Sequence, residues 1–222
     1  MREDEKKEPV QSKGSKAKAI FRETLDTLVF VLVAIIIIRF FLGELRWIPS
    51  GSMRPTLIEK DRVFVEKVTR WYRPLERGDI IVFYPPDENL KKGVFAYFAR
   101  LTGIMCKDVA YIKRIVGMPG DKLEIRKNEV GEHFVYINDR ELDEPYILSS
   151  AEWIECTDDM YCGPVIVPED TYFMMGDNRG NSQDSRFWGF LPKERVIGRS
   201  VFIFWPLDRI RTTGEIKTRF VN

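Results

Sequence analysis

The chain has 222 residues, of which 44% are hydrophobic and 31% are charged, and this composition excludes a disordered protein. Lys and Arg number 35 against 34 Asp and Glu, so a net charge of +1 gives no general basic character, and we expect no nucleic-acid partner. One globular domain is the default for this length, and binding partners have to be inferred from local features.

The N-terminal part divides into a polar segment and an apolar one. Residues 1–24 are charge-rich, and we expect a flexible, solvated segment there. Residues 25–43 are mainly apolar but shorter than the roughly 20 apolar residues of a typical membrane span. Arg39, near the end of this stretch, can reach the membrane interface by snorkelling. We therefore predict a single transmembrane helix over residues 25–43.

Two other readings of residues 25–43 compete with an anchor. A cleaved secretory signal needs a small-residue cleavage site, and GELRWIPSGS, which begins at residue 43, offers no good Ala-x-Ala-like site. A buried core helix is the second alternative. For an anchor, the basic N-terminal flank predicts a cytoplasmic N-terminus, with residues 44–222 outside the cytoplasm.

Residues 44–222 change to short runs rich in Val, Ile, Phe and Tyr, separated by turn residues. This spacing favours strands and hairpins over helices, so we predict a mainly β domain, with an antiparallel sheet or a barrel-like arrangement. The predicted strands lie in the runs DRVFVEKV, GDIIVFYPP, DKLEIRK, EHFVYIND, PVIVPEDTYFMMGD and GRSVFIFWP.

Two irregular stretches interrupt the strand pattern, near residues 88–108 and 140–163. The first is rich in aromatic residues and is compatible with a helix, a hairpin tip or a patch that touches lipid. The second contains Cys156 and Cys162, whose spacing allows a disulfide, with two free thiols as the alternative. The spacing does not match a zinc site. Cys106 is expected to pack as a small apolar group.

A serine pair in the turn PSGSM, residues 49–53, raises the question of which base would activate it. The only histidine, His133, alternates with apolar residues in a predicted strand, so we expect it on an exposed face and not in a Ser-His-Asp triad. Ser-Lys hydrolases use a neutral lysine, which requires burial among apolar groups.

The run AYIKRIVGMPGD supplies a lysine of this kind, Lys113. In a strand, Lys113 would enter the core while its neighbour Arg114 faces the opposite way, toward solvent or a salt bridge. An ordinary solvated strand lysine is the alternative reading. The sequence therefore offers Lys113 as a candidate base without deciding the matter.

The stretch GDNRGNSQDSRFWGFLP, residues 176–192, is dense in polar side chains and lacks the ligand pattern of an EF-hand calcium loop. Asp184 and Arg186 could pair to hold a rigid turn, and Ser182 could orient a neutral lysine amine. A plain surface loop is the alternative.

Four motifs follow the apolar segment in a fixed order: PSGSMRPTL, RGDIIVF, YIKRIVGMPGD and GDNRGNSQDSRFWG. This set resembles that of bacterial type I signal peptidase, a membrane-anchored enzyme that removes signal peptides from exported proteins. The resemblance implies Ser52 as the nucleophile and Lys113 as the general base. It also implies that the Ser50 hydroxyl and the Ser52 backbone N–H stabilise the oxyanion.

The same resemblance implies how the site is supported and what it cuts. Ser182 would hydrogen-bond to the lysine amine, while Asp184 and Arg186 would brace the site. Shallow apolar pockets would select small residues in an Ala-x-Ala pattern, and they would be lined by Ile48, Met53, Leu57, Val82, Tyr111 and Ile112.

The partners and the location also follow from the resemblance. The partners would be signal peptides of exported preproteins, membrane lipid and the secretion machinery, with no metal and no cofactor. The location would be the bacterial cell membrane.

Two other functions compete with a signal peptidase. A self-cleaving Ser-Lys protein like the SOS repressors is disfavoured by the apolar segment and by the absence of a helix-turn-helix pattern for DNA binding. An anchored β-domain could instead bind exported peptides without cutting them, in which case replacing Ser52 would leave its activity unchanged.

Overall fold

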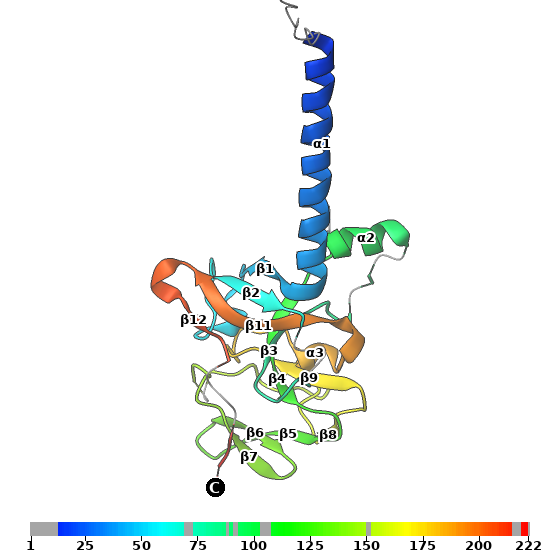
Figure 1. The fold of residues 1–222 in the computed structure, drawn as a ribbon. Coiled ribbons are helices and arrows are strands. Elements are labelled where there is room, and N and C mark those ends of the chain that lie inside the picture. Colours follow the sequence, from blue (N-terminus) through cyan, green and yellow to red (C-terminus); the bar gives the residue numbers. More distant parts are fainter. Residues whose placement is uncertain are drawn as a thin grey trace, which may run out of the picture.

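A long helix stands away from a β-rich body in this protein (Figure 1). Helix α1 (Lys13–Ile37) continues as a short π-helix, η1 (Ile38–Leu42), which leads directly into strand β1 (Gly43–Trp47). The computed structural model describes residues 13–68, 73–87, 89–90, 93–102, 108–149, 152–214 and 219–221.

The body is built from short strands, and every strand pairing described is antiparallel. The prediction of a mainly β, antiparallel domain is therefore confirmed. After β1 the strands are β2 (Arg62–Glu66), β3 (Ile80–Phe83), β4 (Tyr111–Gly117), β5 (Lys122–Lys127), β6 (His133–Ile137), β7 (Arg140–Asp143), β8 (Val165–Ile166), β9 (Thr171–Met175), β10 (Leu191–Pro192), β11 (Val196–Trp205), β12 (Arg211–Thr212) and β13 (Arg219–Phe220).

The described strands form two sheets. The larger runs in the order β1-β2-β11-β3-β4-β9-β10, with β12 paired to β11, and the smaller in the order β13-β7-β6-β5-β8. The helical segments of the body are η2 (Gly51–Met53), α2 (Val94–Thr102), α3 (Ser185–Trp188), η4 (Lys193–Arg195) and η5 (Leu207–Arg209).

Strand β4 lies inside the larger sheet, paired with β3 on one edge and β9 on the other, and all its residues after Tyr111 are buried. Its side chains contribute to three separate hydrophobic clusters, through Ile112, Ile115 and Val116. A strand covered on both faces is rich in Val and Ile and does not alternate with polar residues. Charged side chains on β4 are consequently taken out of water.

The N-terminal helix differs in extent from the sequence prediction. Helix α1 begins at Lys13, inside the segment predicted to be flexible, because Lys, Ala, Glu and Leu there are good helix formers that extend the apolar helix backwards. The helical segment ends at Leu42, and Gly43 already belongs to β1. Among the described residues, no helix is both long enough and apolar enough to cross a membrane.

The two irregular stretches contain ordered features. The first holds helix α2, one of the three forms left open by the sequence. In the second, Cys156 and Cys162 form a disulfide, which decides between the bridge and free thiols. Cys106 lies outside the described residues.

The prediction that His133 faces solvent is wrong. The side chain is buried, with only 4% of the residue exposed, and its ring stacks on that of Trp153 at a centroid distance of 5.4 Å. Trp153 comes from the irregular second stretch and packs on His133, so strand alternation alone does not indicate the burial of His133.

Candidate active site

Ser52 is the middle residue of the single turn η2, and this turn directly follows Ser50, whose backbone is extended. The turn is held from outside by Asn178, whose side-chain amide donates to the Gly51 carbonyl at 3.1 Å. The backbone N–H of Asn178 also donates to the Ser52 carbonyl, at 3.1 Å. Two hydrogen bonds from one distant residue therefore fix the backbone that carries the Ser52 hydroxyl.

Lys113 projects from β4 toward this turn. Its Nζ lies 2.7 Å from Ser52 Oγ and 3.2 Å from the Ile112 carbonyl oxygen. Only 5% of the residue is exposed. Burial lowers the pKa of Lys113 to about 8 from an ordinary value of 10.5, although the carboxylates of Asp184 and Asp177 oppose this effect.

Ser50 lies beside the same hydroxyl. The Oγ atoms of Ser50 and Ser52 are 3.4 Å apart, and Ser50 is exposed. Its hydroxyl is therefore accessible to a bound molecule next to Ser52.

The loop between β9 and α3 and the start of α3 bring the charged side chains of Asp177, Asp184 and Arg186 close enough to Lys113 to affect its pKa. Asp184 caps α3 and pairs with Arg186 at 2.9 Å, with both side chains completely buried. Burial alone would raise the pKa of Asp184, but the charge and hydrogen bonds of Arg186 outweigh it and hold this pKa below its ordinary value. The predicted pairing of these two residues is present.

Ser182 occupies the same loop, and its side chain is buried beside the Asp184 carboxylate, whose pKa it helps to lower. A Cβ on Gly176 would collide with both the Ser182 hydroxyl and the Ser52 carbonyl, so only glycine fits between them. Ser182 thus lies close to the Ser52 turn, and no hydrogen bond joins it to Lys113 in this structure.

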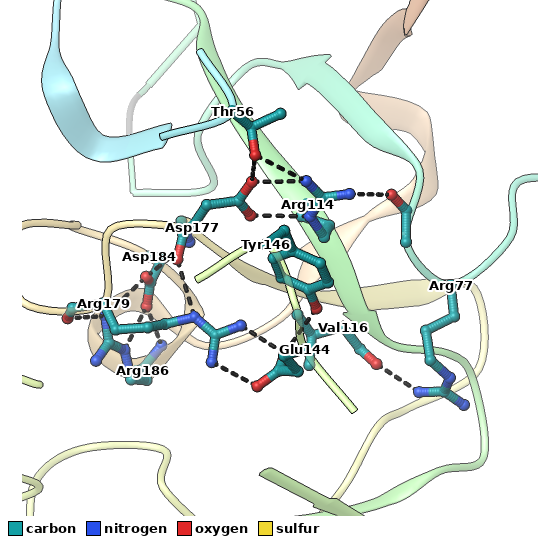
Figure 2. A network of polar contacts seen from close by, with 12 residues as sticks. Thr56, Arg77, Arg114, Val116, Glu144, Tyr146, Asp177, Arg179, Asp184 and Arg186 are labelled. Atoms are coloured by element: carbon teal, nitrogen blue, oxygen red, sulfur yellow. Dashed lines mark hydrogen bonds and ion pairs between the residues drawn. The ribbon is translucent and has the colours of Figure 1, made fainter. Parts of the chain in front are cut away.

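Of the two surroundings that the sequence left open for Arg114, solvent or a salt bridge, the structure shows a salt bridge. Arg114 does not reach solvent, because it forms a completely buried ion pair with Asp177 on β9's following loop. Two hydrogen bonds, of 2.8 and 2.6 Å, join the guanidinium to the two carboxylate oxygens. Thr56, four residues after Ser52, donates to the same carboxylate at 2.5 Å (Figure 2).

This network was not identified from the sequence. Asp177 and Asn178 stand in the recognised GDN motif, but they are 63 and 127 residues away from the groups they hold, Arg114 and Gly51. A buried arginine requires a partner, so placing Arg114 on a fully buried strand would have been the signal to search for a carboxylate.

The six residues predicted to line substrate pockets do not all lie together. Five of them pack in one core cluster and are 0–9% exposed, namely Ile48, Met53, Leu57, Val82 and Ile112. The sixth, Tyr111, is half-buried and packs against another cluster. The structure thus places an apolar core directly beneath the turn that carries Ser52.

A family model of signal peptidases, peptidase S26, matches residues 21–205. The chain belongs to this signal peptidase family. It is 38% identical to a probable signal peptidase I-2 of Synechocystis, over 95% of this chain and 85% of that one. It is 35% identical to signal peptidase I S of Bacillus subtilis, over 90% of this chain and 97% of that one.

A solved signal peptidase I of Enterococcus faecalis, 27% identical, matches 57% of this chain and 97% of its own with a TM-score of 0.40. Family membership makes the chain a serine endopeptidase, a hydrolase that removes signal peptides. The alternative of a β-domain that only binds peptides is therefore disfavoured.

Proposed function

We propose that the chain cuts signal peptides with a Ser52–Lys113 dyad. The observation that carries this proposal is the 2.7 Å contact between Ser52 Oγ and Lys113 Nζ at a buried position. A lysine can accept the serine proton only when its amine is neutral, and burial favours the neutral form. The lowered pKa of Lys113, about 8, supports the same assignment.

The reaction would begin with transfer of the Ser52 proton to Lys113 Nζ and attack of Oγ on the scissile carbonyl carbon. The Ser50 hydroxyl and the Ser52 backbone N–H would stabilise the oxyanion. The protonated amine of Lys113 would then protonate the leaving amine as the peptide bond breaks. A water molecule, losing a proton to Lys113, would then attack the ester carbonyl carbon. As the bond from this carbon to Ser52 Oγ breaks, Lys113 would return the proton to Oγ, and the signal peptide would leave with a free C-terminal carboxyl group.

The supporting residues have distinct parts in this proposal. Asp184 and Arg186 would keep the loop behind Lys113 rigid, as their completely buried ion pair suggests. The Ser182 hydroxyl would hydrogen-bond to the lysine amine once substrate binding adjusts the site, since it is buried and lies next to Gly176 together with the Ser52 carbonyl. A neutral amine can both donate to Ser182 and accept from Ser52.

Cleavage after Ala-x-Ala is a further part of the proposal. An extended peptide would lie along the site strands, with alternate side chains directed at the core beneath Ser52. The predicted pocket residues there, such as Met53 and Leu57, are completely buried. Such a filled floor leaves room only for shallow pockets, which supports selection of small side chains.

The membrane anchor is also a proposal, as are the cytoplasmic N-terminus and the location in the bacterial cell membrane. A series of large apolar side chains, from Leu28 to Leu42 through α1 and η1, is exposed. A helix that is apolar on all sides is normally covered by protein or lipid. Helix α1 stands away from the body (Figure 1), which supports lipid as the covering.

Cleavage of a model preprotein with an Ala-x-Ala site tests the proposal directly. The intact chain in detergent is compared with Ser52→Ala and Lys113→Ala, and mass spectrometry identifies the product termini. We expect cutting after Ala-x-Ala by the intact chain and none by either variant. Undiminished cutting by either variant would show that the dyad is assigned wrongly.

A further inference from the structure

The stretch 140–163 contains no recognised motif, yet two of its residues contact the catalytic framework. We propose that Glu144 and Tyr146 are positioning residues of the peptidase site, acting through Arg179 and Arg114. This inference rests on the proposed Ser52–Lys113 dyad. Figure 2 shows how Glu144 and Tyr146 lie between the two arginines.

Glu144 fixes the loop that carries the supporting residues. Its carboxylate accepts two hydrogen bonds from the Arg179 guanidinium, at 2.9 and 2.5 Å. Arg179 Nε donates to the Gly176 carbonyl at 3.0 Å, and the Arg179 carbonyl accepts from Arg186 at 2.9 Å. Arg179 thus joins the start of the loop to the Asp184–Arg186 pair, and Glu144 holds it in place.

Tyr146 fixes the strand that carries Lys113. Its ring lies under the Arg114 guanidinium, 3.9 Å from the guanidinium carbon to the ring centroid. Its hydroxyl donates to Glu144 at 2.7 Å, and only 1% of the residue is exposed. Because Arg114 directly follows Lys113 on β4, the Tyr146 ring limits movement of the backbone that presents the lysine.

The charges around this contact are balanced in pairs. Three buried arginines each face one carboxylate, and all six side chains are at most 4% exposed: Arg114 with Asp177, Arg179 with Glu144, and Arg186 with Asp184. Removing one carboxylate would leave an unpaired buried charge, so the loop would rearrange. Glu144 and Tyr146 would therefore affect the geometry at Lys113 from buried positions behind it.

The stretch also packs on the loop through other residues. The Trp153 ring lies 4.7 Å from the Arg179 guanidinium carbon, and the Tyr161 backbone N–H donates to the Arg186 carbonyl at 2.8 Å. Glu144 and Tyr146 differ from these because they join the loop and β4 in a single chain of contacts, through Arg179 and Arg114. We therefore assign positioning of the dyad to these two.

The test measures kcat, KM, the pH dependence of kcat and the melting temperature for Glu144→Gln, Tyr146→Leu and Tyr146→Phe in the full chain. Glu155→Gln is the matched control, since Glu155 lies in the same stretch, is exposed and pairs with Lys127. Ser52→Ala and Lys113→Ala are assayed in parallel. If those two variants stay active, the dyad itself is wrong, whatever the other variants show.

We expect Glu144→Gln and Tyr146→Leu to lower kcat on the order of tenfold or more, with KM changed less than twofold, because small displacements of reacting groups slow the chemical step. Tyr146→Leu should also move the acid limb of kcat to higher pH, since water admitted beside β4 hydrates the Lys113 amine. Tyr146→Phe, which keeps the ring on Arg114, should retain most of kcat.

A lower melting temperature with unchanged kcat and unchanged pH limb in Glu144→Gln and Tyr146→Leu would overturn the proposal, because the two residues would then serve stability alone. Equal losses in Glu155→Gln would overturn it as well. If Glu144→Gln and Tyr146→Leu fail to fold, Tyr146→Trp decides, because its larger ring does not fit under Arg114. Unchanged kcat in Tyr146→Trp would contradict positioning, and a lower kcat with an unchanged KM would support it.

Discussion

The pH dependence of cleavage follows from the environment of Lys113. With a pKa of about 8, roughly a tenth of the amine is neutral at pH 7, about half at pH 8 and about nine-tenths at pH 9. At the ordinary value of 10.5, only roughly one molecule in 3000 would be neutral at pH 7. Burial therefore increases the fraction of neutral Lys113 amine at pH 7 about 300-fold. We expect kcat to rise about tenfold per pH unit below pH 8 and to level off above it.

The assay is kcat for a model preprotein at saturating concentration from pH 6 to pH 9.5, with stability checked at each pH. Lys122→Ala is the control, because Lys122 is a half-exposed lysine on β5 that pairs with Asp139. Its profile should match that of the intact chain. A flat kcat over this range would refute the reasoning, as would a limb centred far from pH 8.

Three further predictions concern single substitutions. Lys113→Met should abolish cleavage yet raise the free energy of unfolding at pH 7 by up to about 3 kcal/mol, because the folded state disfavours the charged amine. Between pH 8 and 10.5 the unfolded chain binds more protons than the folded chain, so the intact chain gains stability as the pH rises. The stability advantage of the variant, measured by chemical denaturation, should therefore shrink over this pH range. Ser50→Ala should lower kcat about 100-fold in the cleavage assay while Ser50→Thr, which keeps the hydroxyl, retains most of it; equal activity of both would argue against an oxyanion donor. Asp184→Asn should destabilise the fold by about 3–5 kcal/mol, since it leaves Arg186 without its buried partner, and Asp170→Asn at an exposed position should not change the melting temperature.

Local patterns predicted most of the strands but left the burial of Lys113 open. The six β-rich runs all contain strands, because side-chain alternation and turn residues act over a few positions. Lys113 is buried as its apolar neighbours suggest. Asp184 and Arg186 are two residues apart, so their ion pair could also be predicted from the sequence.

Long-range contacts explain what the sequence did not predict. The burial of His133 depends on Trp153, and that of Arg114 on Asp177, and neither partner is near in sequence. The proposed positioning role of Tyr146 likewise depends on a distant contact, because Arg114 on β4 precedes Tyr146 by 32 residues. Helix α1 begins at Lys13, in a charged segment, because Lys and Glu favour helices as well as solvent exposure.

Ser52 is the nucleophile in the proposed mechanism, and trapping the ester intermediate tests this role most directly. The intact chain is mixed with a model preprotein, quenched in acid within milliseconds to seconds, digested and mapped by mass spectrometry. We predict that the signal peptide is attached through its C-terminal carbonyl to Ser52, and that Ser52→Ala gives no adduct. An adduct on Ser50 or Ser182, or an adduct that persists in Ser52→Ala, would contradict the proposed mechanism.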